Sequence, residues 1–212
     1  ATVAVNTING KTSAEVNDTN VNNIVGSNGN LTLNDTANVF VNAYDKVDMQ
    51  SHIGTLSVGG AATIGAGAAT AVDVNNINRE TAAKIVGVAG TDLNKNIVNG
   101  YYIDVNALGE TDITITESGL AVGAGASGGG AVTGSVSVNH FTGLTNAMVN
   151  GIISNAHQLN IEANRVADIQ TYNNGAAASG GEAAIAVGVG VTYVKDESST
   201  NASLVNSTIE RF

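Results

Sequence analysis

Acidic residues that lie close together in the sequence are the first candidates for chemistry in this chain. Calcium takes roughly six to eight oxygen ligands, so two carboxylates and the carbonyl groups of a turn could form a weak site. The sequence has no Gly-Gly-x-Gly-x-Asp repeat of the kind that binds calcium in some stacked proteins. We therefore interpret the acidic residues as solvated turn positions and predict no metal site. They are Asp45 and Asp48, Asp92, Glu110 and Asp112, and Asp196 and Glu197.

Two Asn-Asp-Thr elements, centred on Asp18 and Asp35, offer a second kind of chemistry. Hydrolysis of a glycosidic bond needs two carboxylates that face each other across the bond. Both elements resemble the Asn-Thr-Asp-type elements of pectin hydrolases, but the histidine and basic elements of that family are missing. We predict no catalytic residue and no enzyme, with a carbohydrate-active β-helix (a polysaccharide hydrolase or lyase) as the alternative. The three histidines are predicted to be solvated or to have a stacked, structural role: His52, His140 and His157.

Two further classes of ligand fit the sequence poorly. Ice binding needs a flat, regular array of Thr-x-Thr elements, and only Thr114-Ile115-Thr116 has that form. Phosphate or dinucleotide binding needs a glycine-rich loop with a Lys-Ser/Thr ending or a following helix, and the glycine-rich stretch 123–134 has neither. We predict no bound cofactor.

The acidic balance of the chain argues against two classes of partner. Its 212 residues carry 18 Asp and Glu against 8 Lys and Arg, which gives a formal net charge of −10. Nucleic acid and anionic lipid both require clustered basic residues. No apolar run approaches the roughly 20 residues that span a bilayer. We therefore predict neither nucleic-acid binding nor membrane insertion. Without cysteine, disulfides and thiolate metal sites are impossible.

A block of two short alternating strands around a polar turn recurs four times along the chain. The copies begin at Val3, Val72, Val136 and Val189, the last with two residues inserted. Internal repetition is the signature of stacked architectures, in which each unit buries its apolar face against the next. The chain also has no proline, a residue that removes a hydrogen-bond donor from a strand ladder. The sequence therefore predicts an all-β fold, a parallel β-helix (β-solenoid).

The spacing of the copies sets the expected number of coils. Asn6, Asn75 and Asn139 lie 69 and 64 residues apart, and Thr192 is the equivalent position in the fourth copy. A coil of a parallel β-helix takes roughly 20 residues, so we expect about three coils in each repeat and about ten in all. At ~4.8 Å per stacked strand the rod would be roughly 50 Å long. Short aliphatic strands at Leu31-Thr32-Leu33, Ile103-Asp104-Val105 and Leu159-Asn160-Ile161 mark equivalent coils.

Another kind of strand alternates small and large residues. Between Ile185 and Tyr193 the large aliphatic residues fall on one face, and Ala186, Gly188 and Gly190 fall on the other. Period-two alternation indicates a strand with one buried face. Glycine weakens a strand, so its dense use indicates close approach of another strand across that face, unless it reflects drift of a low-complexity repeat. Asn side chains at equivalent corners of successive coils can form hydrogen-bonded ladders.

Several of these strings resemble the repeat region of large bacterial filamentous adhesins, in particular the filamentous-haemagglutinin-like, leukotoxin-type adhesins of Gram-negative bacteria. The strings are 66–75, Val122-Gly123-Ala124-Gly125-Ala126 and Leu159-Asn160-Ile161-Glu162-Ala163, and the likeness covers essentially the whole chain. The resemblance implies a right-handed parallel β-helix, export by a two-partner or autotransporter route, and a role in virulence at the cell surface. The secretion domain of that family carries Asn-Pro motifs, which a chain without proline cannot contain.

These observations lead to one expected function and two alternatives. We expect residues 1–212 to be a single β-solenoid segment of a longer repetitive protein, in a secreted, outer-membrane-associated filament used for cell adhesion. Its partner would be a host-cell or bacterial receptor or glycan. The carbohydrate-active β-helix is one alternative. The head of a trimeric autotransporter is the other, because Ala62-Thr63-Ile64-Gly65-Ala66 resembles its Ser-Val-x-Ile-Gly repeats.

Overall fold

The computed structural model describes residues 1–17, 21–22, 25–27, 30–32, 38–86, 97–99, 101–154 and 156–210, and every regular element in these ranges is a β-strand. Two long sheets contain most of the described residues. Sheet 1 has the order β1 (Thr2–Asn17), β6 (Ile64–Val86), β9 (Gly128–Asn150) and β12 (Ala184–Asp196), and β13 (Ser199–Leu204) also pairs with β9. Sheet 2 has the order β11 (Gln158–Gly180), β8 (Tyr102–Gly125) and β5 (Asn38–Ala61).

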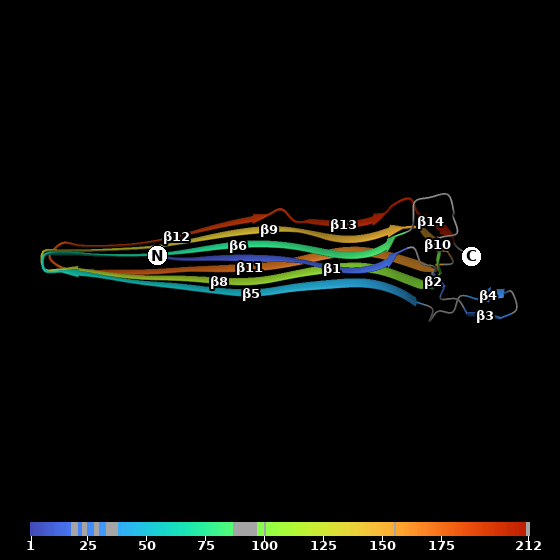
Figure 1. Ribbon diagram of the computed structural model, residues 1–212, viewed down its shortest axis with the longest axis horizontal. Helices are drawn as coiled ribbons and strands as arrows, with labels where there is room; N and C mark the ends of the chain where they lie inside the picture. The colour runs from blue at the N-terminus through green and yellow to red at the C-terminus, as the bar shows by residue number, and fades with distance from the viewer. Residues whose placement is uncertain are drawn as a thin grey trace.

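A short third sheet lies at one end of the two long ones (Figure 1). Its order is β14 (Thr208–Glu210), β10 (Ile152–Ser154), β7 (Ile97–Asn99) and β2 (Val21–Asn22). Every pairing in these three sheets is parallel, whereas β3 (Val25–Ser27) and β4 (Asn30–Thr32) form an antiparallel pair. The predicted all-β, parallel solenoid is confirmed.

Each coil contains two long strands joined by a tight turn, and the short strands of the third sheet lie between one coil and the next. β5 runs the full length of the blade, residues 62–63 turn, and β6 returns on the opposite sheet (Figure 1). The next coil repeats this path with β8 and β9, and the third with β11 and β12. The turns are themselves stacked, because the amide of Ser127 donates to the carbonyl of Thr63 at 2.8 Å and that of Gly129 donates to Ala183 at 3.0 Å.

The prediction of about ten coils of roughly 20 residues is wrong. Asn38 pairs with Tyr102 and Tyr102 with Gln158, so a coil takes 64 and then 56 residues. Each large repeat is therefore one wide coil. A strand of about 23 residues spans roughly 75 Å, and the long axis of the blade lies along the strands (Figure 1). The expected 50 Å rod with its axis along the stack does not describe this molecule.

The register also corrects two alignments made from sequence. β12 and β13 keep one offset of 55 residues from β9, since Val136 pairs with Val191 and Thr145 with Thr200. The fourth copy therefore contains no insertion, and Thr192 lies beside Ser137 instead of Asn139. Leu31 is in β4, and the residue that stacks on Ile103 is Val39.

The interior between the sheets consists of rows of identical or similar side chains. Side chains of β8 alternate between buried and less buried along its whole length, as a strand with one covered face requires. Ala43, Ala107 and Ala163 form one row of sheet 2. Burying a Val, Ile or Phe side chain contributes about 1.5–3 kcal/mol. Among the described residues, the largest fully buried apolar side chains are Ile77, Ile85, Ile103, Val105, Ile113, Ile115, Phe141 and Val149.

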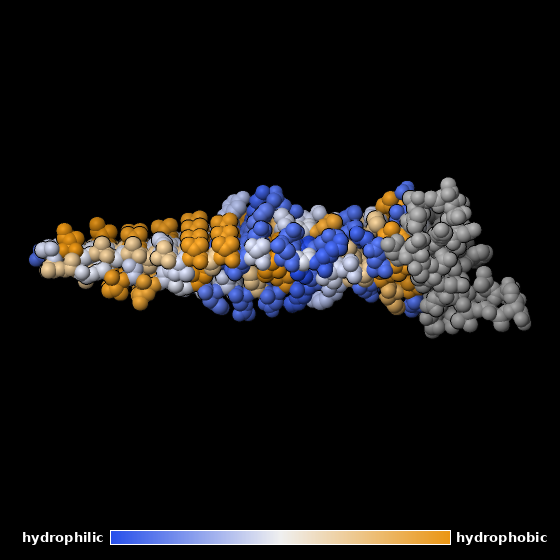
Figure 2. All heavy atoms as spheres, in the orientation of Figure 1, coloured by the Kyte–Doolittle hydropathy of each residue, from blue (hydrophilic) through white to orange (hydrophobic). Residues whose placement is uncertain are grey.

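Near the turns the inward positions are glycine, and the two sheets approach backbone to backbone. A Cβ atom placed on Gly123 would lie 1.8 Å from the carbonyl oxygen of Gly130, and one on Gly59 would lie 1.5 Å from that of Ala66. The predicted packing role of these glycines, close approach of another strand, is confirmed. Figure 2 shows hydrophobic side chains in rows over this end and hydrophilic ones over the middle of the blade.

An asparagine ladder crosses sheet 1 inside the core. The Asn6 amide donates to the Asn75 side-chain oxygen at 2.8 Å, and the Asn75 amide donates to that of Asn139 at 2.8 Å. Asn75 and Asn139 are fully buried. The predicted ladder therefore exists, although it lies in the middle of strands and not at coil corners. Because buried amides must be hydrogen-bonded, the ladder fixes the register of three neighbouring strands.

Candidate functional site

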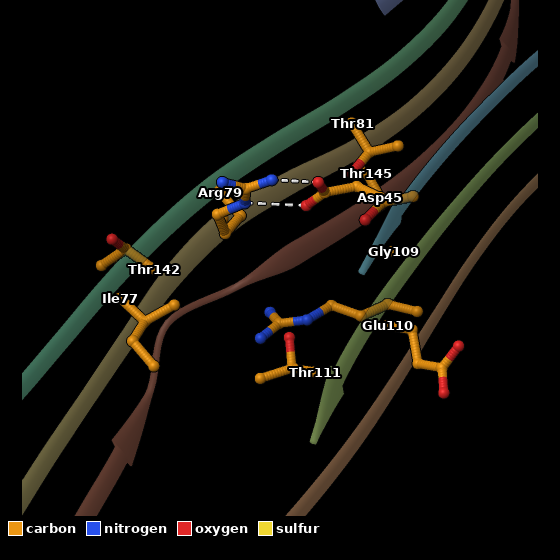
Figure 3. Close-up of a pocket in the computed structure, with 11 residues that line it drawn as sticks. Asp45, Ile77, Arg79, Thr81, Gly109, Glu110, Thr111, Thr142 and Thr145 are labelled. Carbon is orange, nitrogen blue, oxygen red and sulfur yellow. Dashed lines mark hydrogen bonds and ion pairs between the residues drawn. The ribbon is translucent and has the colours of Figure 1, made fainter. Parts of the chain in front are cut away.

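An ion pair joins the two sheets in the middle of the blade. Asp45 points inward from β5 and Arg79 points inward from β6 (Figure 3). The Arg79 guanidinium binds both carboxylate oxygens of Asp45, with Nε 2.8 Å from Oδ2 and Nη2 in contact with Oδ1. Asp45 also accepts a hydrogen bond of 3.1 Å from the Thr12 hydroxyl. This paired geometry satisfies a carboxylate that is only 6% exposed.

Glycine in the neighbouring strands makes room for Arg79. Gly10 and Gly143 flank it in sheet 1, and Gly109 lies beside Asp45 in sheet 2. A Cβ atom on Gly10 would meet the Arg79 guanidinium, and one on Gly143 would lie 2.6 Å from the Arg79 carbonyl oxygen. In the second coil, therefore, Gly109 and Gly143 occupy the positions that correspond to Asp45 and Arg79 in the first coil.

A second inter-sheet ion pair occupies the same region in the third coil, with the charges exchanged between sheets. Arg165 of β11 lies beside Gly109 and reaches Asp196 of β12, with Nη1 3.3 Å from Oδ1. We call this level of Asp45, Arg79, Gly109, Gly143, Arg165 and Asp196 the charged layer. A polar cavity of about 10 Å³ lies within it, lined also by Thr81, Thr111, Thr142 and Thr145 (Figure 3). That volume suits one water molecule, not a substrate.

The charged layer is poorly suited to acid–base catalysis. Hydrogen bonding to Arg79 holds the pKa of Asp45 below its usual value, and the same bond raises the pKa of Arg79. Both groups therefore stay charged near neutral pH. A general acid or base needs a pKa near the working pH. We interpret the charged layer as a structural connection that holds sheet 1 and sheet 2 together.

A fully buried carboxyl lies nearer the turns. Glu117 of β8 is 0% exposed, and neither of its oxygens has a hydrogen-bond partner among the described residues. Burial raises the pKa of Glu117, and repulsion from Asp73 raises it further; the Asp73 amide and Ser135 hydroxyl oppose this shift without reaching hydrogen-bond geometry. Three buried oxygens without partners lie on neighbouring inward positions: Thr55, Thr133 and Asn173.

The outer face of sheet 2 carries a shallow trough of about 540 Å³. It crosses all three strands where the outward residues are small: Gly54, Ser118 and Asn174. Leu120 and Ala176 line one side. None of its lining residues is charged, so the trough suits a neutral, extended ligand and not an ion. It also contains no pair of carboxylates of the kind that glycosidic hydrolysis requires.

The predicted acidic pairs do not converge on a site. Asp18, Asp35 and Asp92 lie outside the described residues. Asp45 faces the core while Asp48 faces solvent, because strand neighbours three positions apart lie on opposite faces. Glu110 and Asp112 share the outer face of β8, where Glu110 accepts hydrogen bonds from Tyr44 at 2.6 Å and Lys46 at 3.0 Å.

Asp196 and Glu197 likewise have separate partners. Asp196 binds Arg165, whereas Glu197 contacts His140 at 2.8 Å and Lys195 at 2.7 Å on the surface. Among the described residues, no group of three or more acidic or histidine side chains is placed to hold a metal ion.

The remaining histidines have separate surroundings. His157 stacks on Tyr101 with ring centroids 4.5 Å apart. His52 is exposed on the outer face of β5. Thr114 and Thr116 point outward from β8, whose inward neighbour Ile115 belongs to the core.

Sequence reasoning missed the charged layer and the buried carboxyl. The signal for Arg79 and Arg165 was a basic residue at an inward position of an alternating pattern, in a chain with only 8 Lys and Arg. For Glu117 the signal was a carboxylate two residues after the inward Ile115.

Comparison with known proteins gives no relative for this chain: no family model, no curated protein and no solved structure matches it. No helix long and apolar enough to cross a bilayer occurs in the described part of the chain.

Proposed function

We propose that this chain is a structural and adhesive segment of a secreted bacterial surface filament. The observation that carries the proposal is the residue-by-residue parallel pairing of strands of 23 or 24 residues over three successive coils. Each coil supplies the template for the next, so the same pairing can extend a stack coil by coil. The cell-surface location, export and role in virulence rest on the sequence resemblance to filamentous adhesins.

The function of such a segment is to present a binding surface on a stiff support. Two inter-sheet ion pairs and an internal asparagine ladder stiffen the blade, and its outer faces remain available for contacts. The trough on sheet 2 is a concave surface that suits a receptor or glycan, because its polar Ser118 and Asn174 lie beside an apolar wall. Glycan binding commonly combines these two kinds of surface.

A glycan array, followed by binding to epithelial cell monolayers, tests the proposal. We expect the chain to bind cells or a neutral glycan, and Ser118→Tyr, which fills the trough, to reduce binding at least tenfold. Thr114→Tyr is the matched control, because it adds the same side chain to the same face of β8 outside the trough.

Three results would count against this proposal. The first is absence of binding to cells and to the array. The second is release of reducing ends from polysaccharide, which would favour the carbohydrate-active alternative. The third is a trimer in solution, which would favour the trimeric autotransporter head.

A further inference from the structure

The outer face of sheet 1 carries a broad apolar surface. It consists of the outward side chains of β12 from Ile185 to Tyr193, of β9 from Gly130 to Val138 and of β6 from Ala66 to Val74, together with Val3 and Val5 of β1. We call it the valine face. Its most exposed large side chains range in exposed fraction from 38% at Val136 to 68% at Val5 and Ile185, whereas Val72, Val74 and Val138 are half-buried.

The exposure of these side chains is not a consequence of a missing interior. Nearest the turns the inward positions are Gly and Ala, and the two sheets touch there through their backbones. Farther along the face the inward positions of β9 are the small polar residues Thr133, Ser135 and Ser137, which are also buried. The sequence therefore places its small residues inside and its large aliphatic residues outside. A soluble sheet with a single covered face has the opposite arrangement. The large residues consequently have their packing partner outside the chain described here.

Two rows of the valine face run across all four strands. Val3, Val72, Val136 and Val191 form one row, and Val5, Val74, Val138 and Tyr193 form the next. Identical side chains stacked across parallel strands form the flat, dry ladders that interdigitate with another sheet. None of the outward residues within the face is charged.

The size of the face matches an interface between two proteins. Its rows lie about 7 Å apart and its strands about 4.8 Å apart, so five rows cover roughly 550 Å² in projection. The valine face therefore lies near the upper end of the range for the largest apolar patch of a monomer, which is roughly 300–600 Å². Two such faces together would bury roughly 1,100 Å², which exceeds the roughly 1,000 Å² that a specific interface needs.

The relief of the face is self-complementary. β12 has a large outward residue at every level from Ile185 to Tyr193, whereas Gly130 and Gly134 lower the surface of β9 beside it, so a ridge and a hollowed strand lie next to each other. A second copy offers the same ridge and the same hollowed strand.

We propose that the valine face binds the valine face of a second copy of this chain, in an isologous dimer with two-fold symmetry. The dimer is then a four-layer structure in which the two copies of sheet 1 meet in the middle and the two copies of sheet 2 face outward. The troughs on sheet 2 remain free on both outer sides. The dimer does not depend on adhesion or on any filament.

Sedimentation equilibrium of the purified chain over a concentration series tests the dimer. We expect twice the mass of one chain, falling to the monomer mass in Val136→Lys and in Val191→Lys. Val58→Lys is the matched control, since Val58 is 71% exposed on the outer face of sheet 2 and its substitution leaves the dimer intact. Far-UV circular dichroism checks that each variant keeps its strands.

Several results would overturn the proposal. A wild-type chain that stays monomeric up to about 100 µM has no self-association of useful strength. Dissociation by Val58→Lys but not by Val136→Lys would place the interface on sheet 2. A trimer, or a monomer that cosediments with phosphatidylcholine vesicles, would give the valine face a different occupant. A single cysteine at Val136 gives a second readout, since the chain has no native cysteine: oxidation should cross-link Val136→Cys more than Val58→Cys.

Discussion

Asp45 and Arg79 lie on opposite sheets, 34 residues apart in the chain, and form an ion pair that bridges the middle of the blade. Both partners are less than a quarter exposed. Arg79 finds its place because Gly10 and Gly143 flank it in sheet 1, and Asp45 has Gly109 beside it. The pair thus depends on three neighbouring strands as well as on its own two.

Removing one partner should destabilise the chain strongly. Arg79→Ala leaves the Asp45 carboxylate buried without its cation, and we expect the free energy of unfolding to fall by about 3 kcal/mol. Urea unfolding followed by circular dichroism measures it. Lys11→Ala is the control, because its bridge to Glu80 is solvent-exposed and should contribute little. Equal effects of the two substitutions would contradict the structural role of Asp45 and Arg79.

The same pair should make stability fall in acid. The pKa of Asp45 is lowered in the folded state by hydrogen bonding to Arg79. Its stabilisation is therefore complete above the unfolded pKa of about 3.9 and is lost as the pH falls through the folded pKa. Urea unfolding between pH 2 and 6 should show this loss in the wild type and a flatter profile in Asp45→Asn. Parallel profiles would show that Asp45 has the same pKa in both states.

Glu117 should give stability the opposite pH dependence to Asp45. Burial raises its pKa, so its neutral form suits the folded state. Stability is then highest below the unfolded pKa of about 4.3 and decreases as the pH rises through the folded pKa. Glu117→Gln should be more stable than the wild type at pH 7 and similar to it at pH 4. Glu110→Gln, on the outer face of the same strand, should show no such gain. A loss of stability in Glu117→Gln at pH 7 would mean that the carboxylate is bound by a partner.

The asparagine ladder should contribute to the free energy of unfolding, because its buried side-chain amides need hydrogen-bond partners. Asn75→Ala removes the acceptor of Asn6 and the donor of Asn139. We expect a loss of about 2–4 kcal/mol, since each buried orphan costs about 1–3 kcal/mol. Asn78→Ala, on the exposed face of β6, is the control. Unfolding in urea measures both, and a loss of less than about 0.5 kcal/mol in Asn75→Ala would argue against a paired ladder.

Contact between the sheets near the turns is testable with one methyl group. Gly123→Ala places a Cβ atom against the Gly130 carbonyl oxygen and should lower the free energy of unfolding by about 1–3 kcal/mol. Gly130→Ala changes the other member of the same contact, but its Cβ atom would have nothing within 4 Å, so it should be tolerated. If thermal unfolding is equally affected by both, the sheets do not touch there.

The repeated block predicts the all-β, parallel stacking of the chain. It does not predict how many residues one coil contains. Val3, Val72 and Val136 are in register as the copies predict, and Thr12, Thr81 and Thr145 are too. The width was missed because the charged layer interrupts the apolar alternation. Asp45, Gly109 and Arg165 occupy inward positions of continuous strands, yet polar residues and glycine at such points resemble turns in a sequence.

The candidate surfaces were even harder to predict. The alternation between Ile185 and Tyr193 shows that two faces differ, but it does not show which face is covered. The glycine face can be identified as the covered one only when it is known that the backbone of sheet 2 contacts it. The trough arises from Gly54, Ser118 and Asn174, which become neighbours only through the 64- and 56-residue register.

The width of the coil is the central claim, and a distance between two spin labels tests it most directly. Asn42 and Val58 both point outward from β5, and the chain offers no competing cysteine. With cysteines at both positions, and dilution with unlabelled chain to remove distances between copies, double electron–electron resonance should give about 50 Å, the length of 16 extended residues. Coils of roughly 20 residues would instead bring the two positions within about 20 Å, and that result would contradict the fold described here.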